Sequence, residues 1–331
     1  MQEERFAERM IFELAPLEGI TTYIYRNAYA HHFGKVDRYY TPFLSLHKEK
    51  EFNHKEKQEI SPLNNEGIRV IPQVLTNSSE DFLRAAKKLK DLGYGEINLN
   101  AGCPSGTVTT KAKGAGMLED PMRLDKFLSE IFEKSEVKIS IKTRLGMEKP
   151  EEWEDLLKIY NKYPLEKLIV HARVREDFYK NSPNWEAFGM ALKESKNPVC
   201  YNGDIFTVED YFRLQDTFPE LESVMLGRGV IANPGLVTQI KEAEANRAVE
   251  AGKRGLFTGD YQRLQAFHDE VYAGYQAIQF GDRNILFKMK ELWHYMVHSF
   301  PDAAKHEKKL RKINSCGEYE SYVKSMFRGV Q

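Results

Sequence analysis

The sequence contains little cysteine, with only Cys103, Cys200 and Cys316 among 331 residues. These three lie far apart, and no two of them form a Cys-x-x-Cys pair. A disulfide framework needs a dense set of cysteines, and a zinc ribbon needs closely spaced pairs. The scarcity therefore excludes both a disulfide-stapled secreted domain and a zinc ribbon.

Long apolar runs are also missing. No uninterrupted stretch approaches the roughly 18 apolar residues that a membrane-spanning helix needs. Residues 1–5 lack the apolar segment that a secretory signal carries. We therefore expect no membrane segment and a soluble, cytoplasmic protein.

An excess of charge of either sign is absent as well. The chain has 48 Lys and Arg against 49 Asp and Glu, for a net charge of −1. This balance excludes a uniformly basic nucleic-acid binder, although a local basic patch remains compatible with it. The hydrophobic fraction of 41% is too high for a disordered chain and is typical of a folded protein.

Short apolar runs, each followed by a segment with helical spacing, fill the first 230 residues or so. One such segment places Leu124, Phe127, Leu128 and Ile131 on one helical face. Alternation of strands and helices requires crossover connections, so we expect parallel strands. Eight units predict an α/β fold of the (β/α)₈ TIM-barrel class, with a doubly wound open sheet as the alternative. The expected strands are residues 12–17, 38–44, 69–75, 96–99, 137–143, 167–171, 198–201 and 223–226.

The pattern changes from residue 260 onward, where strand signals disappear. Phe267, Val271, Tyr275 and Ile278 recur at spacings of four, four and three, which is typical of a helix. We therefore expect two domains: a barrel catalytic domain over residues 1–245 and an all-helical domain over residues 260–331. The segment 252–259 is the expected connection between them.

Polar or glycine-rich residues follow nearly every expected strand. In a (β/α)₈ barrel the active site lies at the carboxyl ends of the strands, so these residues are the candidate site. Their convergence is a stronger signal than any single member. In chain order they are Ala15-Pro16-Leu17, Gln73, Asn100 with Cys103, Lys142 with Arg144, His171 with Arg173, Asn202-Gly203-Asp204, and Gly227-Arg228.

The last two strands predict a phosphate site. Glycine lets backbone N–H groups approach an anion, and barrels frequently bind phosphate after these strands. Gly203, Gly227 and Arg228 have this position. The alternative is that the glycines only close tight turns. Two consecutive loops and an arginine together favour phosphate.

Two candidates carry groups that need a chemical explanation. Lys142 lies in an otherwise apolar strand, where an unpaired charge is costly. Its partner is either a carboxylate such as Glu18 or a bound cofactor, and a neighbouring phosphate site favours the cofactor. Cys103, in a Gly-Cys-Pro turn, is either a small buried apolar residue or a reactive thiol. Its place just past a strand end favours acid or nucleophile chemistry.

The histidines also allow two interpretations. His171 is either a hydrogen-bonded residue of the barrel interior or part of a site, and Arg173 two residues later favours the site. His294 and His298 are four residues apart, as the histidines of a metal pair are. No third ligand accompanies them in sequence, so we expect surface or packing roles for both and no metal.

Taken in order, the motifs resemble those of the tRNA-dihydrouridine synthases, a family of FMN-dependent barrels with a C-terminal helical domain. The resemblance spans essentially the whole chain. Leu17 stands where methionine is usual, Thr22 where aspartate is frequent, and Ala172 where glycine is common. The motifs are Ala15-Pro16-Leu17-Glu18-Gly19, Asn100-Ala101-Gly102-Cys103-Pro104, Lys142-Thr143-Arg144, His171-Ala172-Arg173, Asn202-Gly203-Asp204 and Gly227-Arg228-Gly229.

The resemblance implies reduction of the C5=C6 bond of uridine in tRNA. A hydride would pass from reduced FMN to C6, and Cys103 would protonate C5 as general acid. NADPH or NADH is the implied electron donor. Asn100, Arg144 and Arg173 would contact the substrate. The implied flavin contacts are Ala15, Pro16, Leu17, Gln73, Lys142, His171, Asn202, Gly203, Asp204, Gly227 and Arg228.

A basic segment supports an RNA partner. Residues 283–312 contain eight Lys and Arg against three Asp and Glu, so the remainder of the chain is acidic. A charge run is usually a solvated helix face, but beside a uridine-reducing site it predicts phosphate contacts. The stacked target base must be splayed into the pocket. The expected RNA contacts are Lys288, Lys308, Lys309, Arg311 and Lys312.

Three alternatives stay open. One is an FMN barrel acting on a free pyrimidine, similar to the dihydroorotate dehydrogenases. A second is dihydrouridine synthesis on ribosomal RNA. A third is an RNA-binding barrel that has lost its flavin, against which the joint presence of Cys103, Lys142 and His171 argues. We expect a monomer.

Overall fold

The computed structural model describes residues 9–46, 51–249 and 260–330. The expected connection 252–259 and residues 1–5 lie outside this part. Two compact units divide the chain. The barrel unit comprises residues 1–16, Asp37–Asp204 and Leu214–Leu226, and the helical unit comprises Leu17–Val36, Ile205–Arg213 and Gly227–Gln331. Among the described residues, no helix is both long and apolar enough to cross a membrane.

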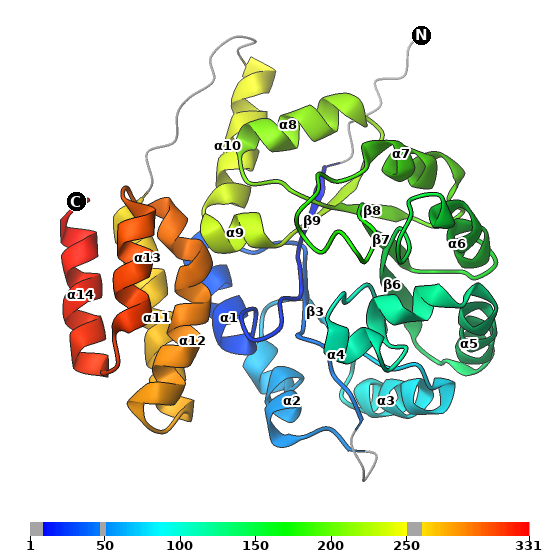
Figure 1. Cartoon of the computed structure of the whole chain (residues 1–331), viewed down its shortest axis with the longest axis horizontal. Helices are drawn as coiled ribbons and strands as arrows, with labels where there is room; N and C mark the ends of the chain where they lie inside the picture. The colour runs from blue at the N-terminus through cyan, green and yellow to red at the C-terminus, as the bar shows by residue number, and fades with distance from the viewer. Residues whose placement is uncertain (1–8, 47–50, 250–259, 331) are drawn as a thin grey trace. The chain divides into compact units, whose positions relative to one another are not determined.

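The barrel unit contains a parallel sheet, which confirms the predicted TIM-barrel class (Figure 1). Each predicted strand overlaps an observed one. The strands in the described residues are β1 (Ile11–Leu14), β2 (Arg38–Tyr40), β3 (Val70–Ile71), β4 (Gln73–Val74), β5 (Glu96–Ala101), β6 (Lys138–Arg144), β7 (Lys167–His171), β8 (Val199–Asn202) and β9 (Ser223–Leu226).

One predicted strand, residues 69–75, is divided by Pro72 into β3 and β4. Proline has no N–H to donate to a ladder, although its carbonyl still accepts from the backbone N–H of Asn98 at 2.9 Å. β3 pairs with β2, and β4 pairs with β5. At the other side β1 pairs with both β2 and β9. The sheet order is therefore that of a nearly closed barrel.

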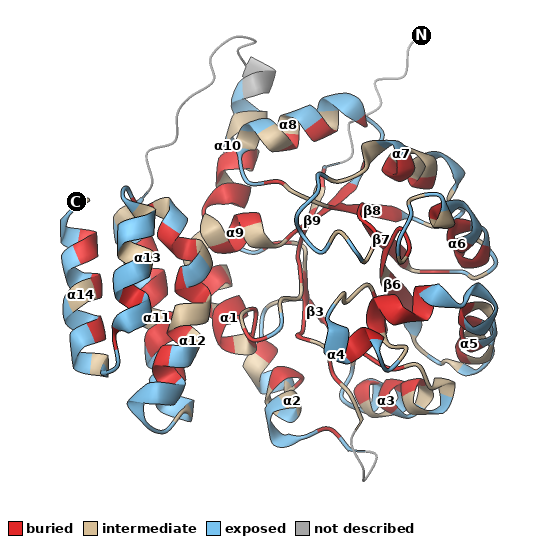
Figure 2. Ribbon diagram, in the orientation of Figure 1, coloured by how far each residue is buried: buried red, intermediate tan, exposed pale blue. Residues whose placement is uncertain are grey.

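Helices follow the strands as amphipathic segments. α3 begins after the N-cap Ser78, whose side chain accepts from the backbone N–H of Asp81, and α5 begins after the N-cap Asp120. Both turn Phe and Leu side chains inward, and Figure 2 shows buried strands surrounded by helices with exposed outer faces.

The helices in the described residues are α1 (Tyr23–Phe33), α2 (His54–Glu59), α3 (Ser79–Asp91), α4 (Gly106–Thr109), α5 (Pro121–Lys134), α6 (Glu152–Tyr160), α7 (Trp185–Glu194), α8 (Val208–Thr217), α9 (Arg228–Ala232), α10 (Leu236–Val249), α11 (Tyr261–Ile278), α12 (Asp282–Met296), α13 (Ala303–Lys312) and α14 (Cys316–Arg328), with 3₁₀ turns η1 (Pro62–Asn65), η2 (Gly114–Glu119) and η3 (Val297–Ser299).

A buried polar cluster connects β1, β2 and β7 of the barrel unit. The Nζ atom of Lys167 lies 2.5 Å from Oε1 of Glu13, and the hydroxyl of Tyr40 donates to Oε2 of Glu13 at 2.8 Å. Burial and the neighbouring Glu13 carboxylate raise the pKa of the Tyr40 phenol. Because these buried groups satisfy one another, we assign the cluster a structural role.

The helical unit contains the region predicted to be all-helical. α11, α12, α13 and α14 pack on one another, and aromatic side chains around Trp293 form their core. The unit also contains α1, α9 and α10, which the sequence analysis assigned to the barrel domain. The domain boundaries at residues 245 and 260 stay predictions.

Candidate active site at the carboxyl ends of the strands

A chain of side-chain amides crosses three neighbouring strands of the barrel unit. Nδ2 of Asn98 donates to Oγ of Ser140 at 3.0 Å, and Nε2 of Gln73 donates to Oδ1 of Asn98 at 2.8 Å. Nδ2 of Asn100 in turn donates to Oε1 of Gln73 at 2.8 Å. These bonds hold Gln73 rigidly, yet its carboxamide keeps one N–H and one carbonyl lone pair for a ligand.

Asn100 also fixes the backbone that carries Cys103. Its Oδ1 accepts from the backbone N–H groups of Gly102 at 3.1 Å and Cys103 at 2.9 Å. The carbonyl of Cys103 accepts from the backbone N–H of Ala115 at 3.0 Å. The half-buried Cys103 is thus held from both sides. The predicted contact of Asn100 with the substrate stays a prediction, whereas the structure shows that its side chain positions the thiol segment.

Lys142 lies opposite Asn100 in the ladder between β5 and β6. It is half-buried, and among the described residues no hydrogen bond or ion pair to its Nζ atom is found. Burial, together with the nearby Arg144 guanidinium, lowers the pKa of the Lys142 ammonium from 10.5 to about 7. The carboxylate partner considered for Lys142 is therefore not observed in this part of the chain. An uncompensated lysine fits an electron-rich ligand at this position.

Arg144 is committed to the protein itself. Its three types of nitrogen donate to backbone carbonyls: Nε to Gly102 at 3.0 Å, and the two terminal nitrogens to Val174 and Phe178, each at 2.8 Å. The guanidinium therefore ties the loop after β5 to the loop after β7. A direct role of Arg144 toward the substrate, which the sequence suggested, stays a prediction.

His171, Arg173 and Asp204 form a connected group at the ends of β7 and β8. Arg173 makes two contacts with the Asp204 carboxylate, at 3.1 and 2.5 Å, and its NH1 lies 3.2 Å from Nε2 of His171. Because a guanidinium can only donate, Nε2 of His171 must accept. A neutral His171 consequently carries its proton on Nδ1, and Arg173 acts as the group that sets this tautomer.

The expected phosphate residues fall in both units. Asn202 is buried and donates through Nδ2 to the carbonyl of Met225 at 2.9 Å. Gly203 has a packing reason of its own, because a Cβ there would lie 2.1 Å from the Tyr201 hydroxyl oxygen. Gly227, the N-cap of α9, and Arg228 belong to the helical unit, where Arg228 stacks at 5.4 Å over the Phe206 ring. Phosphate binding by these residues stays a prediction.

The first-strand residues are also divided between the units. Ala15 is buried and donates its backbone N–H to the carbonyl of Leu226 at 2.8 Å, so it extends the pairing of β1 with β9. Pro16 is half-buried and ends the barrel-unit segment. Leu17 begins the helical unit, and its N–H donates to Oγ1 of Thr21 at 2.8 Å. Contacts of these three residues with a flavin stay predictions.

The loop between β7 and α7 contains a residue that sequence reasoning missed. Tyr179 is 51% exposed, its ring centre lies 5.9 Å from that of His171, and the Arg144 guanidinium lies 5.4 Å from its centre. Phe178, just before it, has a φ of +49°. The signal in the sequence was an aromatic pair inside an otherwise polar loop. Tyr179 therefore presents an exposed ring beside the candidate site.

In the helical unit, the predicted RNA-binding side chains fall into two groups. Lys288, Lys309 and Arg311 each lie within 2.8 Å of a carboxylate oxygen, from Glu291, Glu318 and Glu307 respectively. Lys308 and Lys312 are exposed on α13 and have no ion pair among the described residues. The second group is therefore free to meet phosphates.

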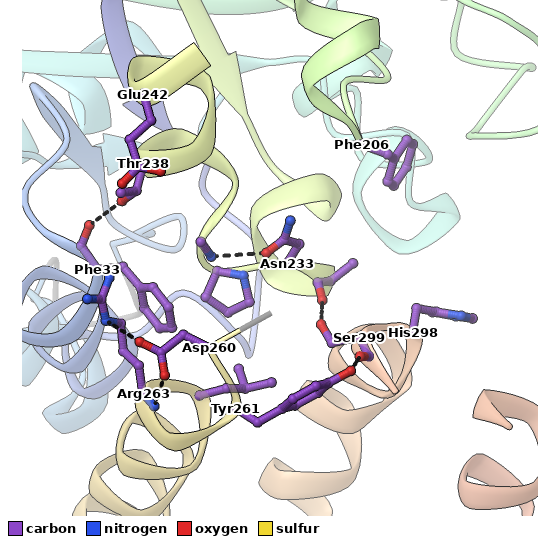
Figure 3. A pocket seen from close by; sticks show the side chains of 14 residues that line it. Phe33, Phe206, Asn233, Thr238, Glu242, Asp260, Tyr261, Arg263, His298 and Ser299 are labelled. Carbon is purple, nitrogen blue, oxygen red and sulfur yellow. Dashed lines mark hydrogen bonds and ion pairs between the residues drawn. The ribbon is translucent and has the colours of Figure 1, made fainter. Parts of the chain in front are cut away.

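A cavity of about 540 Å³ lies elsewhere in the helical unit (Figure 3). Its lining includes Phe33, Asn233, Tyr261 and His298 but none of the predicted site residues. Several of its polar groups are already used, since Ser299 donates to the carbonyl of Ala232 and Tyr261 donates to that of Ser299. The strand-end site, which brings together a thiol, a lysine and a histidine, is the better candidate for catalysis.

A parallel barrel with these groups at its strand ends defines an enzyme of the TIM-barrel class. The dihydrouridine synthase family model matches residues 13–325. The chain belongs to the dihydrouridine synthase family and is therefore a flavin-dependent oxidoreductase.

Curated relatives agree with this assignment. A tRNA-dihydrouridine(16) synthase of Pseudomonas putida is 27% identical, over 93% of this chain and 94% of the relative. A protein of the same name from Pseudomonas syringae pv. tomato is 29% identical over 72% of this chain and 77% of the relative. Among solved structures, histamine dehydrogenase from Rhizobium sp. 4-9 aligns with 78% of this chain and 49% of its own, with a TM-score of 0.51 and 12% identity. The last similarity shows the fold alone.

Proposed function

We propose that this enzyme reduces the C5=C6 bond of uridine in tRNA to 5,6-dihydrouridine, with FMN as its flavin and NADPH or NADH as electron donor. The observation that carries the proposal is the pairing of Asn100 with Lys142, because it joins the thiol segment of Cys103 to an uncompensated lysine at one rim. The names of the two Pseudomonas relatives support tRNA as the substrate.

The residues at the rim fit a flavin. Lys142 lacks a protein partner in the described chain, and Gln73 keeps one donor and one acceptor, so both suit the polar edge of an isoalloxazine ring. His171 and Arg173 lie beside them on β7 and in the segment that follows it. When bound, FMN would supply the hydride that C6 of the uracil accepts. The proposed remaining flavin contacts are Ala15, Pro16, Leu17, Asn202, Gly203, Asp204, Gly227 and Arg228.

The protein would then orient the base and provide a proton. Asn100 and Ala115 hold the backbone of Cys103, so its thiol can be directed at C5 of the target base as general acid. Arg173 fixes the His171 tautomer and is itself held by Asp204. Tyr179 offers an exposed ring on which a base splayed from the RNA can stack. The helical unit would bind RNA phosphates through exposed lysines of α13.

Free pyrimidine is the competing substrate. The basic residues of α13 favour a macromolecular substrate, because a free pyrimidine has no phosphate groups that these residues could bind. Ribosomal RNA shares the same chemistry and is separated from tRNA only by assay. We also propose that the enzyme acts as a monomer, which light scattering of the purified protein would check.

The test uses purified protein and an unmodified tRNA transcript. The protein should be yellow, release FMN on denaturation, and form dihydrouridine with NADPH or NADH, as mapped by mass spectrometry. Cys103→Ala should keep the flavin and lose turnover. The matched control is Cys316→Ala, which removes another half-buried thiol and should keep both.

Two results would overturn the proposal. A colourless protein that cannot be reconstituted with FMN would remove the flavin, and equal reduction of free uridine and tRNA would favour the small-molecule substrate. Mapping should examine position 16 first, since that position appears in the names of the two relatives.

A further inference from the structure

Two histidines at the end of α1 meet a glutamate of α11 in the helical unit. Nδ1 of His31 lies 2.7 Å from Oε2 of Glu270, and Nε2 of His32 lies 2.8 Å from the same oxygen. The three candidate ligand atoms all lie within 4.8 Å of one another. The sequence predicted no metal because His294 and His298 lack a third ligand nearby. It gave no signal for His31 and His32, which lie more than 230 residues before Glu270 in the chain.

We propose that His31, His32 and Glu270 form a binding site for a transition-metal ion of the Zn²⁺ type. Imidazole nitrogen and carboxylate oxygen are ligands that such ions prefer. At metal–ligand distances of about 2.0 to 2.2 Å, tetrahedral ligand atoms lie about 3.3 to 3.6 Å apart. The two contacts with Glu270, at 2.7 and 2.8 Å, are shorter than this, so a modest outward movement of the side chains would admit the ion.

Packing around the cluster holds the two helices in place without help from the cluster itself. The Phe267 ring of α11 packs edge-on against Tyr25 and Phe33 of α1, at centroid distances of 5.4 and 5.5 Å. Further along the same interface, Thr22 and Tyr275 share a hydrogen bond of 3.0 Å between their hydroxyl groups. Preorganised ligands lose little conformational freedom on binding a metal, so this arrangement favours affinity.

The charges around the cluster also suit a cation. His31 and His32 lie in the last turn of α1, where the helix dipole places partial negative charge. In the described part of the chain, Glu270 has no lysine or arginine partner that would compete with a metal. Without a metal, each imidazole must direct a proton at the same oxygen. A metal ion replaces both of these protons.

Exposure leaves room for the remaining ligands of the ion. The side chain of His31 is 71% exposed, that of Glu270 is 40% exposed and that of His32 is 15% exposed. Water can therefore complete the coordination from the solvent side. A bound ion would link α1 to α11, and this role does not depend on the flavin or on tRNA.

The test is a titration of the full chain, prepared without a histidine tag and stripped by a chelator, with ZnCl₂ alone. Calorimetry should show one saturable site per chain. His31→Ala and Glu270→Gln should each weaken binding more than about tenfold, since even indirect partners of metal ligands contribute tenfold or more. His294→Ala, which removes the exposed histidine paired with Glu307, should not change the affinity.

Absence of saturable binding would overturn the proposal. Unchanged affinity in both His31→Ala and Glu270→Gln would also overturn it, because the ion would then be held elsewhere, for example by a cysteine. His31 is mostly exposed and glutamine keeps the shape of Glu270, so both variants should retain the helical circular dichroism of the parent. That spectrum separates loss of ligands from loss of fold.

Discussion

Gly114 lies directly against Cys103. A Cβ atom at Gly114 would come within 2.8 Å of the Cys103 carbonyl oxygen and 2.9 Å of its Cβ, and the φ of Gly114 is +56°. Only glycine adopts this conformation without strain and leaves room for the cysteine. The segment 114–119 therefore determines where the candidate acid lies, although it carries no reactive group.

Gly114→Ala should disturb the position of Cys103 without affecting flavin binding. We expect destabilisation by about 2 kcal/mol from the left-handed backbone and the contact, and a loss of turnover on tRNA of tenfold or more. Flavin content should stay near that of the parent. Gly106→Ala is the matched control, because a Cβ there meets nothing within 4 Å. Equal turnover of the Gly114→Ala variant and the parent would show that Cys103 tolerates displacement.

The ionisation of Lys142 predicts an unusual pH dependence of stability. Its pKa is about 7 in the folded state and 10.5 ordinarily, so between these values the unfolded chain binds the extra proton. The free energy of unfolding of the flavin-free protein should therefore rise from pH 7 toward pH 10, by at most about 1.4 kcal/mol per pH unit.

Denaturant unfolding of Lys142→Met at several pH values would check this. The variant should lose the rise attributed to Lys142. Lys138→Met is the control on the same strand, since Lys138 is exposed and paired with Glu166 at 2.9 Å. If the parent and Lys142→Met share one pH dependence, the lysine is not held in an uncompensated state.

The strands could be predicted because a strand that is buried on both faces appears in the sequence as a short apolar run. The division of one predicted strand at Pro72 was missed because it depends on the missing N–H of proline, which the apolar pattern does not reveal. The candidate site was predictable as a set of strand-end residues. The contacts that each of these residues makes were less predictable. The three carbonyls bound by Arg144, for example, come from loops that are brought together only by folding. The meeting of His31 with Glu270 is equally non-local.

Tyr179 should act on the RNA substrate. Stacking of one base on an aromatic ring contributes about 1–3 kcal/mol, so Tyr179→Ala should reduce kcat/KM for tRNA by roughly tenfold or more. Tyr179→Phe keeps the ring and should stay close to the parent. Flavin content, measured by absorbance, should be the same in both variants. Loss of flavin from Tyr179→Ala would instead assign the ring to the cofactor.

The exposed lysines of α13 should set the salt dependence of tRNA binding. Each phosphate contact contributes about 0.7–0.9 to the slope of log affinity against log salt. Lys308→Gln combined with Lys312→Gln should lower that slope by about 1.5. Fluorescence anisotropy of labelled tRNA at several KCl concentrations would measure it.

Lys309 and Arg311 provide the internal comparison on the same helix. Their side chains already meet Glu318 at 2.7 Å and Glu307 at 2.6 Å, so a phosphate must displace a carboxylate before it can bind. The double variant Lys309→Gln and Arg311→Gln should therefore change the slope less than the Lys308 and Lys312 pair. Equal changes would show that the ion pairs open freely in the complex. No change in either double variant would place the RNA on another surface, because counterion release requires basic groups at the interface.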